Sequence, residues 1–203
     1  TNTAACFFIN KCDKENADPT RALDALRAAF GNKIAPLQIA IGAAHSFSGY
    51  VDLVHRKAYT TEGGKEVEVE VPAELADEVA RRRDQLLEAA AEADDEVLMK
   101  YLEGEEVTDP ELEACLRKGV KESILAPVLV GSAATGTGLQ ALLDAIVRYL
   151  PSPADEGPVT ALDKAGKEVE VAPDADGPLL VRVFKTAADP FVGRLTYLRV
   201  LSG

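Results

Sequence analysis

Two short apolar runs constrain the fold of this chain more than any other feature of its sequence. Cys6–Ile9 and Pro127–Val130 contain no charged residue and do not alternate with polar positions. Runs of this kind form strands that are buried on both faces, as in a parallel sheet covered by helices. Each run leads into a polar or small-residue loop and then into a helical pattern. The sequence therefore predicts an α/β fold.

The helices after the two runs have recognisable beginnings. Asp18 and Pro19 supply an N-cap and a first-turn proline for the first helix. Thr137 is the expected cap of the second helix. The predicted apolar side of that second helix consists of Leu139, Leu142, Leu143, Ile146 and Leu150.

The residues between the two runs follow a different pattern. Three strands are expected there, with glycines at their turns: Pro36–Ile41, Phe47–Val54 and Glu66–Val71. The last of them alternates strictly, so one face should be buried and the other acidic and solvated. Helices follow from about residue 73 to residue 102, with a break near 94–95, and again after the capping box at 108–111. Beyond the linker at 151–153 the pattern is all-β.

Composition limits the classes of function. The chain has 203 residues, 47% of them apolar, and a formal net charge of −12. Such an acidic chain is repelled by phosphate backbones, so we expect no direct sequence-specific nucleic-acid binding. Its three cysteines form no C-x-x-C pair, which favours a reducing, cytoplasmic location. No apolar run approaches the length of a membrane span, and His45 and His55 lack partners at metal-ligand spacing.

The tetrapeptide Asn10-Lys11-Cys12-Asp13 directly follows the first buried run. Ligands of parallel-sheet proteins bind at the carboxyl ends of the strands, where this loop is expected. A carboxylate at Asp13 can accept hydrogen bonds from N1–H and the 2-amino group of guanine, a donor pair that adenine lacks. Asn10 can bond the other edge of the base and tie neighbouring loops together, and the Lys11 stem can cover its face. The alternative is an ordinary polar strand-to-helix loop.

Gly131-Ser132-Ala133 follows the second run in the same way. Small residues allow backbone N–H groups near Ser132 and Ala133 to approach the guanine O6 closely, although a small-residue turn chosen for packing is the alternative. Gly131 and Gly136 have the spacing of a phosphate-binding loop, but Thr137 stands where such a loop requires Lys. We therefore predict guanine-binding residues in this chain, and neither catalytic residues nor a metal site.

The acid-rich stretch at 74–106 allows two interpretations. It is expected to be a solvated face with helix-stabilising charge pairs, and the alternative is an acidic docking surface for a basic protein.

From end to end, the chain resembles the central stretch of bacterial elongation factor G. The segments that carry the resemblance, beyond Asn10–Asp13, are Gly49–Val54, Lys100–Glu106, Pro127–Ala133, Leu142–Pro153 and Asp189–Thr196. The resemblance implies the C-terminal part of a P-loop GTPase-type parallel sheet with an inserted α/β subdomain, followed by the start of an all-β barrel. The implied segments are 1–32 and 120–152 for the GTPase domain, 33–119 for the insert and 153–203 for the truncated barrel.

The resemblance also implies a function. The parent protein would bind GTP/GDP with Mg, hydrolyse GTP on the ribosome and drive translocation, whereas the chain alone should be inactive because it has no phosphate loop. The insert would meet the ribosomal stalk protein, and the barrel the small subunit. A ribosome-docking module of a factor-G-like paralogue, or a ribosomal-protection or release-factor relative, is the alternative. Cys12, the segment 44–46 and the segment 134–137 depart from the usual family pattern and put the housekeeping role in doubt.

One structural expectation completes the sequence-based prediction. The strand at 6–9 should pair with the strand at 128–130 on one side only. Its other edge is then exposed and apolar, which predicts self-association.

Overall fold

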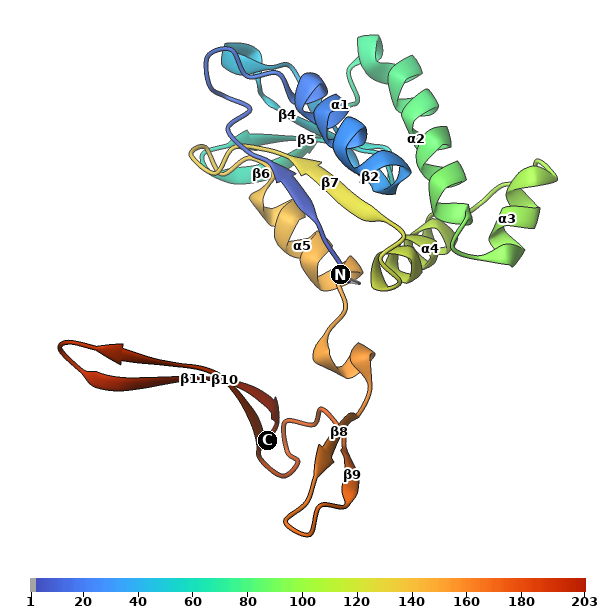
Figure 1. The fold of residues 1–203 in the computed structure, drawn as a ribbon. Helices are drawn as coiled ribbons and strands as arrows, with labels where there is room; N and C mark the ends of the chain where they lie inside the picture. The colour runs from blue at the N-terminus through green and yellow to red at the C-terminus, as the bar shows by residue number, and fades with distance from the viewer. Residues whose placement is uncertain (1–2) are drawn as a thin grey trace. The chain divides into compact units, whose positions relative to one another are not determined.

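The computed structural model describes residues 3–203, so residues 1 and 2 of the first predicted segment lie outside the described part of the chain. The chain forms two compact units, Thr1–Leu150 and Pro151–Gly203. In the first unit a parallel sheet and an antiparallel sheet lie among five α-helices (Figure 1). Within residues 3–203 we find no helix that is both long and apolar enough to cross a membrane.

The parallel sheet contains the two apolar runs that the sequence singled out. Its order is β1-β7-β2, and the strands are β1 (Phe7–Ile9), β7 (Ala126–Val130) and β2 (Ile34–Pro36). Phe7 lies beside Val128 and Ile9 beside Val130, and Ile34 lies beside Ala126 on the other side of β7. All residues of β7 are buried, as expected for a central strand with both faces covered.

Helices cover the two faces of this sheet. Leu23 and Leu26 of α1 (Pro19–Phe30) pack on Phe7, Ile9 and Val128, whereas Phe8 and Leu129 point to the opposite face. That opposite face packs against α5 (Leu139–Tyr149) through Ala145 and Tyr149. Among the described strands β1 pairs only with β7, which agrees with the expected free edge, although its side chains are half-buried rather than fully exposed.

Two details of α5 differ from the prediction. Its N-cap is Gly138 and not Thr137, whose hydroxyl lies 2.9 Å from the Thr135 hydroxyl instead of capping the helix. The predicted apolar side is also wrong at Leu143 and Ile146, which are 57% and 41% exposed. Ala145 and Tyr149, four positions apart, are the buried residues of the helix instead, and they pack on the sheet.

The antiparallel sheet has the order β3-β4-β5-β6. Its strands are β3 (Gln38–Ile41), β4 (Gly49–Asp52), β5 (Lys57–Glu62) and β6 (Lys65–Val69). The strand β5 is not predicted from the sequence, because its polar residues resemble a loop. The sequence predicts an alternating strand at 66–71 with its valines buried, but Val67 is 39% exposed and Glu66 is partly buried.

Three helices complete the first unit, as the helical patterns indicated. They are α2 (Ala76–Ala91), α3 (Asp95–Leu102) and α4 (Asp109–Lys121). Asp94 caps α3 at the predicted break, and Thr108 and Glu111 form the predicted capping box of α4. Short 3₁₀ turns lie at Gly31–Lys33, Ala44–Ser46 and Ala73–Leu75.

The second unit is all-β after a 3₁₀ turn at Pro153–Glu156. It contains two antiparallel hairpins, β8 (Val159–Leu162) with β9 (Glu168–Val171) and β10 (Leu180–Asp189) with β11 (Gly193–Ser202). Both turns lie where the sequence predicted them, at 163–166 and 189–193.

Candidate guanine-recognition site

The two predicted loops lie side by side at the carboxyl ends of β1 and β7. The register that places Ile9 beside Val130 brings both strand ends to the same edge of the sheet. Backbone hydrogen bonds then join the loops: Gly131 N–H donates to Ile9 O at 3.0 Å, and Cys12 N–H donates to Gly131 O at 3.1 Å. Parallel pairing of two distant segments therefore builds the site.

Asp13 is held from both sides. The Ser132 hydroxyl donates to Asp13 Oδ1 at 2.6 Å, and Lys14 Nζ lies 3.0 Å from Oδ2. The hydrogen bond from Ser132, followed by the one from Lys14, lowers the pKa of the Asp13 carboxyl below its usual value. Ser132 itself is completely buried. Asp13 is therefore an ionised hydrogen-bond acceptor in a fixed orientation at neutral pH.

Asn10 joins the two loops through its side chain. Its Oδ1 accepts from Lys11 N–H at 2.7 Å and from Ala133 N–H at 3.0 Å. Lys11 has a left-handed backbone (φ 63°) and is exposed. The structure thus brings together Asn10, Asp13, Ser132 and Ala133 by direct contact, with Lys11 adjoining Asn10.

The loop from Gly131 to Gly138, here called the Ser132 loop, is closed by its own hydrogen bonds. Ser132 N–H donates to Thr137 O at 2.9 Å, and Gly136 N–H donates to Ser132 O at 2.9 Å. A Cβ at Gly131 would lie 2.3 Å from Thr137 O and 2.6 Å from the Phe8 ring, so only glycine fits there. Since the N–H groups of Ser132 and Ala133 already have acceptors, neither points to open space in this structure.

Cys12 has a packing role in this loop. It is 1% exposed, its thiol donates to Ile9 O at 3.2 Å, and burial raises its pKa. Tyr50 of β4 and Val130 belong to the same buried cluster. The antiparallel sheet therefore supports the loop that carries Asp13.

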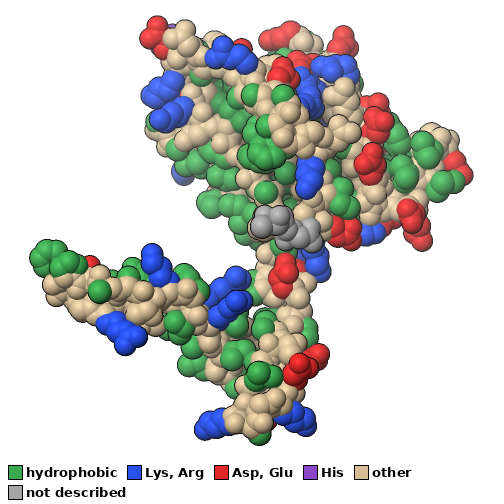
Figure 2. All heavy atoms as spheres, viewed as in Figure 1, with side chains coloured by type: hydrophobic (Ala, Val, Ile, Leu, Met, Phe, Trp, Pro, Cys, Tyr) green, Lys and Arg blue, Asp and Glu red, His purple; other side chains and the backbone are tan. Residues whose placement is uncertain are grey.

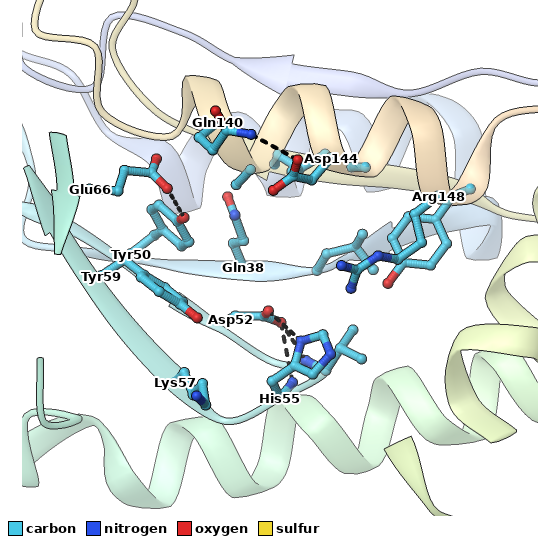
Figure 3. A pocket seen from close by; sticks show the side chains of 16 residues that line it. Gln38, Tyr50, Asp52, His55, Lys57, Tyr59, Glu66, Gln140, Asp144 and Arg148 are labelled. Carbon is cyan, nitrogen blue, oxygen red and sulfur yellow. Dashed lines mark hydrogen bonds and ion pairs between the residues drawn. The ribbon is translucent and has the colours of Figure 1, made fainter. Parts of the chain in front are cut away.

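Sequence reasoning missed two further side chains that support the site. Gln38 Oε1 of β3 accepts from Val130 N–H at 3.1 Å, and Glu66 Oε1 of β6 accepts from Gly138 N–H at 2.9 Å. Figure 3 shows both side chains, with Tyr50 donating to Glu66 Oε2 at 2.8 Å. No local pattern could have identified them, because their partners lie 92 and 72 positions away.

Gln38 and Glu66 also line a cleft of about 390 Å³ between the antiparallel sheet and α5 (Figure 3). Tyr50, Tyr59, Gln140 and Asp144 are among its other lining residues. None of the five predicted guanine-binding residues lines it. The cleft is thus separate from the proposed base site.

Metal-ligating side chains do not gather in the described part of the chain. Across residues 3–203 there is no cluster of three His, Cys, Asp or Glu side chains that could hold a metal ion. His55 lies 2.7 Å from Asp52 Oδ2 and 3.2 Å from Glu113 Oε1, which gives it a structural contact.

A parallel sheet with polar loops at the carboxyl ends of neighbouring strands is typical of α/β proteins that bind ligands at these strand ends, nucleotides among them. Comparison with known proteins identifies the family within that class. Residues 1–152 match the family model described as the elongation factor Tu GTP binding domain. The chain belongs to this family.

Curated relatives support the resemblance to elongation factor G. Elongation factor G of Mycoplasma pneumoniae is 41% identical over 200 residues, which are 97% of this chain and 29% of that protein. Elongation factor G of Ureaplasma parvum is 40% identical over 205 residues, covering 100% of this chain and 30% of the relative. The chain thus spans about 30% of the length of these relatives.

A solved structure has the same fold. A crystal structure of a protein from Thermus thermophilus matches with a TM-score of 0.78 and 36% identity, over 100% of this chain and 28% of that one. The predicted resemblance to the elongation factor G family is confirmed.

Proposed function

We propose that this chain is part of a ribosome-dependent translational GTPase whose guanine site consists of Asn10, Lys11, Asp13, Ser132 and Ala133. Asn10, Lys11 and Asp13 face the base in this proposal, whereas Ser132 and Ala133 act through their hydrogen bonds to Asp13 and Asn10 and not through N–H groups directed at O6. One observation carries the proposal. The Asp13–Ser132 and Asn10–Ala133 hydrogen bonds join two loops at adjacent parallel strand ends. Matches to a GTP-binding domain and to elongation factor G support the same assignment.

The chemistry of base selection depends on the Asp13 carboxylate. The Ser132 hydroxyl donates one hydrogen bond to Asp13 Oδ1 and so orients the carboxylate. The ionised carboxylate then accepts from N1–H and the 2-amino group of guanine. Adenine offers no such donors on that edge, and a carboxylate without its partners costs about 1–3 kcal/mol. Asn10 Oδ1 already accepts from the N–H groups of Lys11 and Ala133, so Nδ2 is the atom of this amide that can donate to the other edge of the base.

The intact protein would bind and hydrolyse GTP and drive translocation in the cytoplasm. Residues 1–32 and 120–152 form the guanine-reading part of its GTPase domain, residues 33–119 the insert and residues 153–203 the start of a barrel. Pairing of β2 with β7 supports extending the first part to Pro36. The 203 residues contain no G-x-x-x-x-G-K-[ST] segment, so this chain by itself does not hydrolyse GTP and binds GDP weakly.

Two partners follow from the same proposal. The insert contacts the ribosomal stalk protein, and the barrel contacts the small subunit. Figure 2 shows acidic side chains over the region of α2, α3 and α4, which suits a basic partner.

The test compares GDP with ADP on this chain by ligand-observed NMR. The chain should bind GDP in preference to ADP, and Asp13→Asn should reduce that preference about tenfold or more, because hydrogen bonds to a charged group contribute about 1.5–3 kcal/mol. Asp24→Asn, an exposed site on α1, is the matched control. An unchanged GDP/ADP ratio in Asp13→Asn would exclude the assignment of Asp13.

The acidic surface favours a second candidate, a ribosome-docking module. Titration with purified stalk protein distinguishes the two functions. Saturable stalk binding without any GDP binding favours docking as the activity of this chain, whether its parent is a translocase, a factor-G-like paralogue or a ribosomal-protection or release-factor relative.

A further inference from the structure

The Ser132 loop ends at a residue that cannot stabilise the following helix by itself. Gly138 is the N-cap of α5, with φ at 78°, and a Cβ there would lie 2.4 Å from Val130 O. Glycine is therefore required, and it has no side chain with which to cap the helix. The first turn of α5 contains no acidic residue either. Any charged acceptor at this helix start must come from elsewhere in the chain.

Glu66 supplies that acceptor from β6. Its Oε1 accepts from Gly138 N–H at 2.9 Å, and its Oε2 accepts from the Tyr50 hydroxyl at 2.8 Å (Figure 3). Tyr50 is only 3% exposed and stacks on Tyr59 with ring centroids 5.4 Å apart. Both oxygens of the carboxylate are thus fixed, and its negative charge lies at the positive end of a helix.

The start of the Ser132 loop is fixed from the same sheet. Gln38 of β3 is 6% exposed, and its Oε1 accepts from Val130 N–H, the residue directly before Gly131. Between these two anchors lie the contacts of the proposed base site, Ser132 with Asp13 and Ala133 with Asn10. One short loop is therefore held at both ends by side chains of the antiparallel sheet.

We propose that Glu66 is a positioning residue of the guanine site, and that the antiparallel sheet is thereby a structural component of base recognition. This inference rests on the proposed function. Without the Glu66 carboxylate, the Gly138 end of the loop loses its acceptor, and Ser132 is held less firmly against Asp13. Guanine preference then falls although no residue that touches the base has changed.

The first experiment requires no nucleotide. Amide hydrogen exchange is measured by NMR on the 203-residue chain and on Glu66→Ala, Glu66→Gln and Glu68→Ala. Glu68 lies on the same strand, and its carboxylate pairs only with the exposed Lys57 among the described contacts, so it is the matched control. Glu66→Ala should raise the exchange rates of Gly136 and Gly138 about tenfold, the loss of one charge-assisted hydrogen bond.

Further readouts separate positioning from general destabilisation. The Gly138 amide proton should move upfield in Glu66→Ala, because its bond to a carboxylate is lost. Glu66→Gln keeps one carbonyl acceptor, so its Gly138 exchange rate and chemical shift should lie between those of Glu66→Ala and those of the unsubstituted 203-residue chain. The exchange rate of Leu129 in β7 should not change. Equal effects of Glu66→Ala and Glu68→Ala, or a rise in exchange throughout β7, would overturn the inference.

The second experiment measures the GDP/ADP preference of the same variants. A reduced preference in Glu66→Ala, with that of Glu68→Ala unchanged, supports positioning. An unchanged preference in Glu66→Ala overturns it. If the unsubstituted 203-residue chain shows no preference for GDP over ADP, the proposed function is contradicted and not the role of Glu66. The hydrogen-exchange data then decide whether Glu66 orders the loop.

Discussion

Arg83 of α2 has a buried guanidinium that joins three segments of the first unit. Its Nη1 donates to Leu53 O at 2.8 Å and, over a short distance, to Val54 O, and its Nη2 donates to Asp109 Oδ1 at 2.5 Å. The residue is 7% exposed. We expect Arg83→Met, which keeps most of the apolar stem, to destabilise this unit strongly because the acceptors remain without their donor.

The magnitude follows from the burial of those acceptors. Leu53 and Val54 are at most 1% exposed, and each orphaned carbonyl costs about 1–3 kcal/mol. The Asp109 carboxylate is 29% exposed and keeps its ion pair with Arg56 at 3.3 Å, so losing the Arg83 contact there costs little free energy. The total is about 4 kcal/mol, within the range for breaking a buried ion pair. With a urea m-value of about 2 kcal/mol/M, the unfolding midpoint should fall by about 2 M.

Far-ultraviolet circular dichroism in urea is a suitable assay, because all five α-helices of the described chain lie in the first unit. Arg81→Met is the matched control on the same helix: its side chain is 56% exposed and lies 3.7 Å from Glu78, so it should cost less than about 0.5 kcal/mol. A midpoint in Arg83→Met no lower than that of Arg81→Met would refute the reasoning.

Three other perturbations test separate features. Gly131→Ala should force position 131 away from Thr137 O and from the Phe8 ring and so distort the Ser132 loop; shifted Ser132 and Gly136 amide resonances by NMR would show this, and unchanged resonances would contradict the contact distances. Lys100 and then Thr108 lower the pKa of Glu111 from 4.5 to about 2, so stability present above pH 4.5 is lost as the pH falls toward 2. The melting temperature of Glu111→Gln should fall less than that of the unsubstituted chain between pH 4.5 and pH 2. An equal fall in both proteins would argue against a stabilising Glu111–Lys100 ion pair. Sedimentation velocity should show concentration-dependent self-association through the free edge of β1, whereas a strictly monomeric chain at high concentration would exclude it.

The features that sequence could predict are those set by local pattern. The continuous apolar runs of β1 and β7 require burial on both faces, and the structure gives them that environment. Thr108 with Glu111, and Asp94 before α3, are caps whose partners lie within a few positions. The Asn10–Asp13 loop was located for the same reason, because it directly follows a recognisable strand.

The misses have a common physical cause, which is tertiary contact. The polar strand β5 forms because β4 and β6 lie on both sides of it. Leu143 and Ile146 are on the periodic face of α5, but Ala145 and not these residues packs in the core with the sheet. Glu66 was assigned to a solvated acidic face, yet two donors from distant segments bind it. Short-range periodicity contains no information about any of these contacts.

The segment 134–137 forms a well-defined turn in this structure. Gly136 adopts φ 84°, the Thr135 and Thr137 hydroxyls lie 2.9 Å apart, and Thr137 O accepts from Ser132 N–H. These bonds close the turn but give the Gly138 N–H no acceptor within the loop, and Glu66 is the residue that accepts from it. The hydrogen bonds of the turn and the Glu66 acceptor from the neighbouring sheet together hold Ser132 in place. Variation in this loop and the residue at position 66 should then be considered together, as two parts of one recognition site.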